Sequence, residues 1–397
     1  MKSLRVGFLS SHNYLDRNAW SGIIYYMYKA LTERNIQVVG LGKPPKKNSL
    51  WQRVLNKLWK QNDCIKIGSP RYIAEYNELA SLVQKQLIET PCDAIFAPVA
   101  KREVAFIKTN IPIVYCSDVT CFLHLKHYKI DLEPEEIEWE KRQEALAISN
   151  ATKLVYPSEW AANSAISDYH AESGKIEVIP FGANIDDCEL ANEVLSKKQH
   201  QVCRLLFVGK DWERKGGNLA VETLICLQKM GIEAELVMVG SKLPDEVRTE
   251  NRTVIPFLNK NDRQQRQQLN SLFLRANFFI FPTRADCSPI VICEANAFGL
   301  PVITTDVGGI PTIVKNGKNG YMLPLSATGS DCANLIAKVF SDRELYNQLV
   351  LSSREEYERR LNWNKWAESI EQVFVSLLNY EGKKQIVRTN YTGNFGE

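Results

Sequence analysis

Short apolar runs alternate with longer segments of helical periodicity along most of the chain. In the first half the apolar runs have the length of buried strands, and they lie at residues 4–9, 37–41, 94–97, 113–115, 153–156 and 176–179. Segments of helical character fall between them, at residues 22–33, 73–89 and 135–150. Strands that alternate with helices in this way predict a parallel sheet flanked by helices.

The second half of the chain repeats this alternation. Strand-like and helix-like segments follow one another at residues 204–208, 218–229, 235–239, 262–275 and 278–282. The intervening stretch from Asp186 to Gln201 is polar and is interpreted as a linker. A chain of 397 residues is also too long for one ordinary core. We therefore predict an α/β protein with two doubly wound, Rossmann-like domains that face a cleft, at residues 1–185 and 186–365.

The segment 286–294, with the sequence Asp-Cys-Ser-Pro-Ile-Val-Ile-Cys-Glu, carries the clearest chemical pattern. Ser288 is expected to cap a helix whose first turn contains Pro289. The free N–H groups of Ile290 and Val291 would then meet the positive end of the helix dipole, which suits a phosphate. Glu294 would lie about two turns into the helix, where it can accept hydrogen bonds from sugar hydroxyls. The alternative is a buried helix whose start happens to be acidic.

A basic loop follows the predicted strand at residues 204–208. It begins at Gly209 and contains Lys210, Arg214 and Lys215 before the next helix. Fixed cations at such a place can stabilise the negative charge that develops on a departing diphosphate. The alternative is a solvated basic loop without a ligand.

Loop positions after other strands are further candidates. Gly308 and Gly309 follow a strand and Gly22 precedes a helix, so each would allow close approach of a ligand to the backbone. A turn with positive φ, or an ordinary helix start, explains these glycines equally well. Asp118 also follows a strand and either contacts a substrate or caps a turn.

Composition narrows the class of protein. The apolar fraction of 45% and the charged fraction of 24% are ordinary for a globular protein, and the net charge of +3 gives no reason to expect a nucleic-acid partner. The ten cysteines include no C-x-x-C pair, which indicates reduced thiols. The apolar run at residues 4–9 is too short for a signal peptide, and no run is long enough to span a membrane. A cytoplasmic protein is expected.

Residues 43–60 are unusually basic and aromatic. Trp51, Leu55 and Trp59 would share one face of a helix, with lysine and arginine side chains around it. This pattern is typical of a helix at a membrane interface, and it is also typical of a helix packed on its own domain. Both readings stay open, and the first would place the protein peripherally at the inner face of a membrane.

Three motifs together resemble the retaining glycosyltransferases of family 4, which have the GT-B fold. They are the segments 286–294, 209–217 and 306–311, each moderately specific by itself and more specific together. The resemblance implies that Glu294 binds the donor ribose and that Asp286, at a position that is commonly Glu, contacts the donor sugar. It implies that Lys210 and Lys215 contact the diphosphate and that no metal or other cofactor is needed.

The same resemblance implies that the final helix, at about residues 366–380, crosses back to the first domain, followed by a polar tail at 381–397. It also implies transfer of a sugar from a nucleotide diphosphate sugar to a hydroxyl group of a glycan, a lipid-linked molecule or a small molecule, as in polysaccharide biosynthesis. A nucleotide-sugar epimerase, a phosphorylase-like enzyme of the same fold and a non-catalytic nucleotide-sugar-binding protein remain as alternatives.

Overall fold

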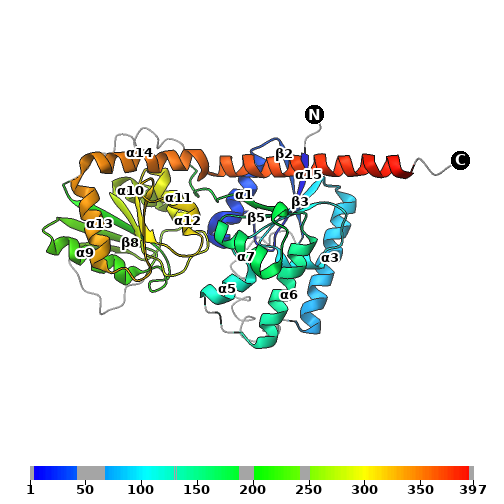
Figure 1. Ribbon diagram of the computed structural model, residues 1–397, viewed down its shortest axis with the longest axis horizontal. Coiled ribbons are helices and arrows are strands. Elements are labelled where there is room, and N and C mark those ends of the chain that lie inside the picture. The colour runs from blue at the N-terminus through cyan, green and yellow to red at the C-terminus, as the bar shows by residue number, and fades with distance from the viewer. Residues whose placement is uncertain are drawn as a thin grey trace. The chain divides into compact units, whose positions relative to one another are not determined.

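The computed structural model describes residues 4–42, 68–128, 130, 132–186, 201–241 and 251–392 (Figure 1). The basic aromatic segment at 43–60 lies outside the described residues. By their internal contacts the residues form two compact units. The first unit comprises Met1–Tyr156, Ala162–Ile179 and Ala367–Glu397, and the second comprises Pro157–Ala161 and Pro180–Trp366.

The first unit is built on a parallel sheet of six strands in the order β2-β1-β3-β4-β5-β6. The strands are β1 (Leu4–Leu9), β2 (Ile36–Leu41), β3 (Ala94–Pro98), β4 (Ile113–Cys116), β5 (Lys153–Tyr156) and β6 (Ile176–Val178). All six were predicted from their apolar runs. Residues of the central strands, such as Phe96 and Val114, are fully buried, as helices on both faces of a parallel sheet require.

The helices of the first unit begin at recognisable signals. They are α1 (Ile23–Thr32), α3 (Pro70–Glu89), α4 (Lys101–Phe106), α5 (Cys121–Tyr128), α6 (Pro134–Asn150) and α7 (Glu159–Tyr169), with short 3₁₀ turns at Ala19–Gly22 and Ser173–Lys175. Ser69 caps α3 by accepting a hydrogen bond from the Tyr72 N–H group, and Glu133 and Glu136 form a capping box at α6. The sequence pattern did not predict α4, α5 and α7.

The second unit has its own parallel sheet of six strands, in the order β12-β11-β10-β7-β8-β9. The strands are β7 (Cys203–Val208), β8 (Ala234–Val239), β9 (Arg252–Ile255), β10 (Phe278–Phe281), β11 (Val302–Thr305) and β12 (Gly320–Leu323). The helices are α9 (Gly217–Lys229), α10 (Arg263–Arg275), α11 (Ile290–Ala297), α12 (Ile310–Ile313), α13 (Gly329–Ser341) and α14 (Arg343–Arg360). A last helix, α15 (Trp363–Thr392), begins in this unit and belongs to the first unit from Ala367 onward. The doubly wound architecture predicted for both halves is confirmed.

The strand order of the second sheet reverses between β7 and β10. From β7 the chain continues to β8 and β9 on one side, and β10, β11 and β12 follow on the other side. Loops that leave the carboxyl ends of two such strands diverge and leave a crevice, which is where open α/β sheets bind ligands. Those two loops, at residues 209–216 and 282–289, are the ones that carry the sequence motifs.

Two helices are divided between the units. The boundary falls inside α7, after Ala161, and inside α15, after Trp366. The long part of the second unit begins at Pro180, six residues before residue 186, where the second domain was predicted to begin. Helix α15 extends to Thr392 and thus includes most of the segment that was expected to be a polar tail.

Candidate functional site

An ion pair joins the two loops at the strand-order reversal. The Lys215 ammonium donates to the Asp286 carboxylate, and both side chains are largely buried, at 15% and 10% exposed. Lys215 comes from the loop after β7, and Asp286 comes from the loop after β10. Two residues that the sequence assigned separately to diphosphate and sugar contacts are therefore direct neighbours.

Arg214 holds these loops together. Its Nη1 atom donates to the Ala285 carbonyl at 2.9 Å, and its Nε atom pairs with Asp211 at 3.0 Å. Its own carbonyl accepts hydrogen bonds from the Arg284 N–H group at 2.7 Å and the Thr283 hydroxyl at 3.0 Å. Arg214 was predicted to bind the donor, and in the structure its guanidinium group fixes the backbone beside Asp286.

Two glycines allow the backbone to come close at this place. Gly216 has φ of 77°, and a Cβ atom there would lie 2.0 Å from the Pro282 carbonyl oxygen. A Cβ atom on Gly309 would lie 1.8 Å from the Cys287 carbonyl oxygen, and the Gly309 N–H group donates to the Asp286 carbonyl at 3.2 Å. Gly309 therefore supports the loop that carries Asp286. Its neighbour Gly308 has φ of 55°, as a turn that favours glycine requires.

The start of α11 differs from the prediction. Ser288 does not cap the helix, because Pro289 occupies the N-cap position and no side-chain capping bond is present. The Ser288 hydroxyl is instead buried without a hydrogen-bond partner. Ile290 and Val291 are the first two helical residues, and an α-helix leaves N–H groups at such positions without intrahelical partners. Because the helix starts at Ile290, Glu294 lies little more than one turn into it, not two.

Glu294 forms a second ion pair with a lysine that sequence reasoning missed. The Lys260 ammonium, from the loop after β9, donates to the Glu294 carboxylate, which is almost fully buried. Burial raises the pKa of Glu294, while Lys260 and a hydrogen bond from the Asn184 backbone act in the opposite direction. No sequence signal pointed to Lys260, since β9 was not predicted.

Lys210 and Gly209 directly follow β7. The Lys210 ammonium lies 5.3 Å from the ring centroid of Phe257, whose side chain is half exposed in the loop after β9. A Cβ atom on Gly209 would lie 3.1 Å from the Lys215 side chain. Three lysines thus follow strands of this sheet, and two of them, Lys215 and Lys260, pair with carboxylates.

The remaining candidates lie in the first unit. Gly22, with φ of 87°, is the N-cap residue of α1, and it follows Trp20 and Ser21, which also have positive φ. The start of a helix therefore explains Gly22. Asp118 lies in the turn between β4 and α5, where the Ser117 hydroxyl donates to the Val119 carbonyl at 2.8 Å.

A buried polar cluster in the first unit was not predicted. Glu140 on α6 pairs with Lys101 at 2.5 Å and with Arg102 at 2.7 Å, both from the start of α4. One turn further on, Glu144 accepts a hydrogen bond from the Tyr115 hydroxyl at 3.2 Å. Burial raises the pKa of Glu144 to about 7, against the opposing effects of Lys101 and Tyr115.

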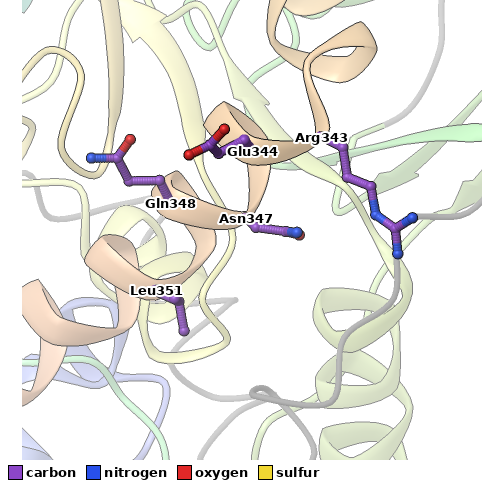
Figure 2. Close-up of a pocket in the computed structure, with 5 residues that line it drawn as sticks. All are labelled: Arg343, Glu344, Asn347, Gln348 and Leu351. Atoms are coloured by element: carbon purple, nitrogen blue, oxygen red, sulfur yellow. The ribbon is translucent and has the colours of Figure 1, made fainter.

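The described part of the chain offers no candidate metal site or disulfide. It holds no group of three or more His, Cys, Asp or Glu side chains placed to bind a metal ion, and its cysteines are free thiols. None of its helices has a stretch long and apolar enough to cross a bilayer. A shallow hollow of about 660 Å³ lies against α14 (Figure 2), lined by Arg343, Glu344, Asn347, Gln348 and Leu351. None of the candidate residues lines it.

Comparison with known proteins places the second unit beside glycosyltransferases. Residues 202–342 match the family described as glycosyl transferases group 1. The chain is 26% identical over 256 residues to the capsular polysaccharide biosynthesis glycosyltransferase CapM of Staphylococcus aureus, covering 60% of this chain and 66% of CapM. It is 22% identical over 277 residues to a D-inositol 3-phosphate glycosyltransferase of Gordonia bronchialis, covering 63% and 59% of the two chains. The matches thus span less than two thirds of these relatives.

Solved structures share the fold over almost the whole chain. A sucrose-phosphate synthase from Thermosynechococcus elongatus matches with a TM-score of 0.66 at 16% identity, covering 95% of this chain and all of the other. Anabaena HepE, solved in complex with UDP, matches with a TM-score of 0.63 at 16% identity, covering 94% of this chain and 100% of HepE. The two parallel sheets and the likeness to these structures show the two-domain, Rossmann-like GT-B fold, and residues 202–342 of the second unit are similar to the group 1 glycosyl transferases.

Proposed function

We propose that the protein transfers a sugar from a nucleoside diphosphate sugar to a hydroxyl acceptor, with retention of the anomeric configuration. The observation that carries this proposal is the Lys215–Asp286 pair, because it sets a cation and a carboxylate side by side at the strand-order reversal. A donor of this kind has both a charged leaving group and a neutral polyhydroxyl group, and the pair offers a partner for each.

The second unit would hold the donor. The N–H groups at the start of α11 and the Lys215 ammonium would contact the diphosphate, with Lys210 as a further cation. Glu294 would accept hydrogen bonds from the ribose hydroxyls, and Asp286 would accept them from the transferred sugar. Anabaena HepE was solved in complex with UDP-glucose, which makes uridine diphosphate sugars the first donors to test.

The proposed chemistry needs no nucleophile from the protein. The bond between the anomeric carbon and the phosphate oxygen breaks while the acceptor oxygen attacks from the same face. The acceptor proton passes to the departing phosphate oxygen. Charge accumulates on the diphosphate in this step, and Lys215 and the helix dipole would stabilise it. These groups can do the work of a metal ion, so the proposal includes none.

The acceptor would be bound by loops of the first unit. Asp118, which follows β4, would orient its hydroxyl group. CapM is named for capsular polysaccharide biosynthesis, and we infer that this chain likewise builds a polysaccharide or a glycoconjugate. Gly22, at the start of α1, would let the backbone come close to the donor phosphates and the acceptor.

Product analysis tests the proposal. The protein is incubated with a panel of nucleoside diphosphate sugars and oligosaccharide or glycolipid acceptors, and the products are separated by chromatography and assigned by NMR. A free nucleoside diphosphate together with a glycoside of the donor's anomeric configuration supports retaining transfer. An altered free sugar would instead identify an epimerase, and binding without turnover would identify a non-catalytic protein.

A further inference from the structure

Glu294 is a carboxylate in a place where a charge is costly. Its side chain is 3% exposed on α11, and removing a carboxylate from water costs several kcal/mol unless another group compensates. Two groups do so in the structure: the Lys260 ammonium and the Asn184 backbone N–H group. Asn184 is itself held in place, because its side-chain oxygen accepts a hydrogen bond from the Trp363 indole at 2.9 Å.

Lys260 is delivered to Glu294 by a fixed loop. Its carbonyl accepts a hydrogen bond from Arg266 Nη1 at 2.7 Å. The neighbouring Asn259 N–H group donates to the Gln265 side chain at 2.8 Å, and Asp262 caps α10 by accepting from the Gln265 N–H group. The loop is thus anchored to the first turn of α10 on both sides of the lysine. A surface lysine in chance contact with a carboxylate would need none of these bonds.

The pair leaves part of the carboxylate available. Lys260 bonds to Glu294 Oε1, and a carboxylate offers about four lone-pair sites on its two oxygens. We propose that Lys260 is a positioning residue for donor binding, which keeps Glu294 ionised and orients it so that its remaining lone pairs accept the two ribose hydroxyls. The identity of the ligand rests on the proposed function, whereas the state of the ion pair does not.

The surroundings of Glu294 determine what removal of Lys260 should do. Lys260 and Asn184 lower the pKa of Glu294, and burial, the largest effect, raises it. On its own helix the neighbouring group is the Cys293 thiol, whose pKa burial also raises. Arg360, on α14, lowers the pKa of Cys293 against this effect of burial. The Arg360 side chain is engaged by the carboxylate of Glu356. Without Lys260, less opposes burial, so the pKa of Glu294, which is already raised, should rise further and the carboxyl group should hold its proton to higher pH.

The test compares Lys260→Met, Lys260→Arg and the wild type by calorimetric titration with uridine diphosphate from pH 5.5 to 8.5, with other nucleoside diphosphates in parallel. A protonated Glu294 loses a charged acceptor, so Lys260→Met should bind about ten- to a hundredfold more weakly at pH 6. Its affinity should recover at higher pH, whereas Lys260→Arg should follow the wild type. An unchanged profile, or equal weakening at every pH, would overturn the proposal.

Lys318→Met is the matched control. Lys318 also pairs with a buried carboxylate of the second unit, that of Glu356, at 2.9 Å. Glu356 keeps Arg359 and Arg360 as partners when this lysine is removed. The control should therefore leave both nucleotide affinity and its pH dependence unchanged. A shift in this variant equal to that of Lys260→Met would show that any lost lysine has this effect, and the proposal would fail.

A second measurement works without a ligand. The thermal unfolding of Lys260→Met is followed from pH 5 to 8 beside a variant that also carries Glu294→Gln. A folded-state pKa above the unfolded value makes stability fall as pH rises. Because loss of Lys260 should raise the folded-state pKa of Glu294 further, the stability of Lys260→Met should fall more steeply with pH than that of the wild type, and the double variant should lack this steeper fall. Equal slopes would overturn the role of Lys260. If no nucleoside diphosphate binds the wild type, the proposed function fails, and this measurement still decides whether Lys260 keeps Glu294 ionised.

Discussion

Replacing Glu144 by glutamine is expected to remove a pH dependence from the stability of the first unit. Glu144 is buried on α6 and accepts a hydrogen bond from Tyr115 on β4. Burial raises its pKa from 4.5 to about 7. Each pKa unit by which folding strengthens proton binding is worth about 1.4 kcal/mol, so this rise corresponds to at most about 3 kcal/mol.

The sign follows from where the proton is held. Below pH 4.5 Glu144 is neutral in both the folded and the unfolded chain, and its contribution to stability is fully present. As pH rises from 4.5 to about 7, only the folded chain keeps the proton, so the free energy of unfolding decreases. Glutamine stays neutral throughout. The variant should match the wild type near pH 4.5 and exceed it in stability by up to about 3 kcal/mol at pH 8.

The assay must report on the first unit alone. Hydrogen exchange of the β4 peptide, followed by mass spectrometry in a urea series at several pH values, gives the local free energy of unfolding. Glu140→Gln serves as the control, because Lys101 and Arg102 lower the pKa of Glu140 against its burial. That variant should lose stability at neutral pH. If Glu144→Gln keeps the wild-type dependence on pH, Glu144 is ionised in the folded protein and the reasoning is wrong.

Three further predictions concern the second unit. Lys215→Ala should lower turnover by about 100- to 1000-fold while weakening donor binding less, as measured by steady-state kinetics and calorimetry; near-normal turnover would show that the Lys215–Asp286 pair only holds the two loops together. Asp286→Asn should lose most turnover but still bind the bare nucleoside diphosphate, and Asp286→Glu should retain some activity or change the preferred donor; loss of nucleotide binding in Asp286→Asn would assign the carboxylate a structural role. Glu294→Ala should weaken binding of the nucleoside diphosphate by about 1.5–3 kcal/mol for each lost hydrogen bond, and unchanged calorimetric affinity in a folded variant would contradict the ribose contact.

The fold could be predicted from the sequence wherever an element is marked by its own residues. The run Phe278–Phe281 is fully buried in β10, and its uninterrupted apolar character is typical of a central parallel strand. The elements that were not predicted have a weaker pattern of apolar and polar residues. Strand β9 has the sequence Arg-Thr-Val-Ile and is only partly buried, and α5 contains two histidines and a lysine. Tertiary packing rather than local pattern defines these elements.

The site could be predicted only where its residues stand in a recognisable local motif. Lys215 and Asp286 were both selected from their loops, but their direct contact depends on the adjacency of β7 and β10, which the sheet order establishes. The Lys260–Glu294 pair joins positions 34 residues apart, and Lys260 lies in the loop after β9, a strand that was not predicted. The Ser288 cap was wrong because Pro289, expected inside the first turn, is itself the N-cap residue.

The division of the chain between its units has a consequence for synthesis. All residues of the second unit precede Ala367, whereas the first unit lacks its last segment until the final part of the chain has been translated. Phe374 in that segment packs against Phe96 of β3, and Glu371 forms an ion pair with Arg34 at 2.5 Å. On the ribosome, the unit encoded first is therefore the one completed last. Until Phe374 has been synthesised, Phe96 lacks this aromatic partner. The incomplete first unit is therefore the part of the nascent chain that we expect a chaperone to bind.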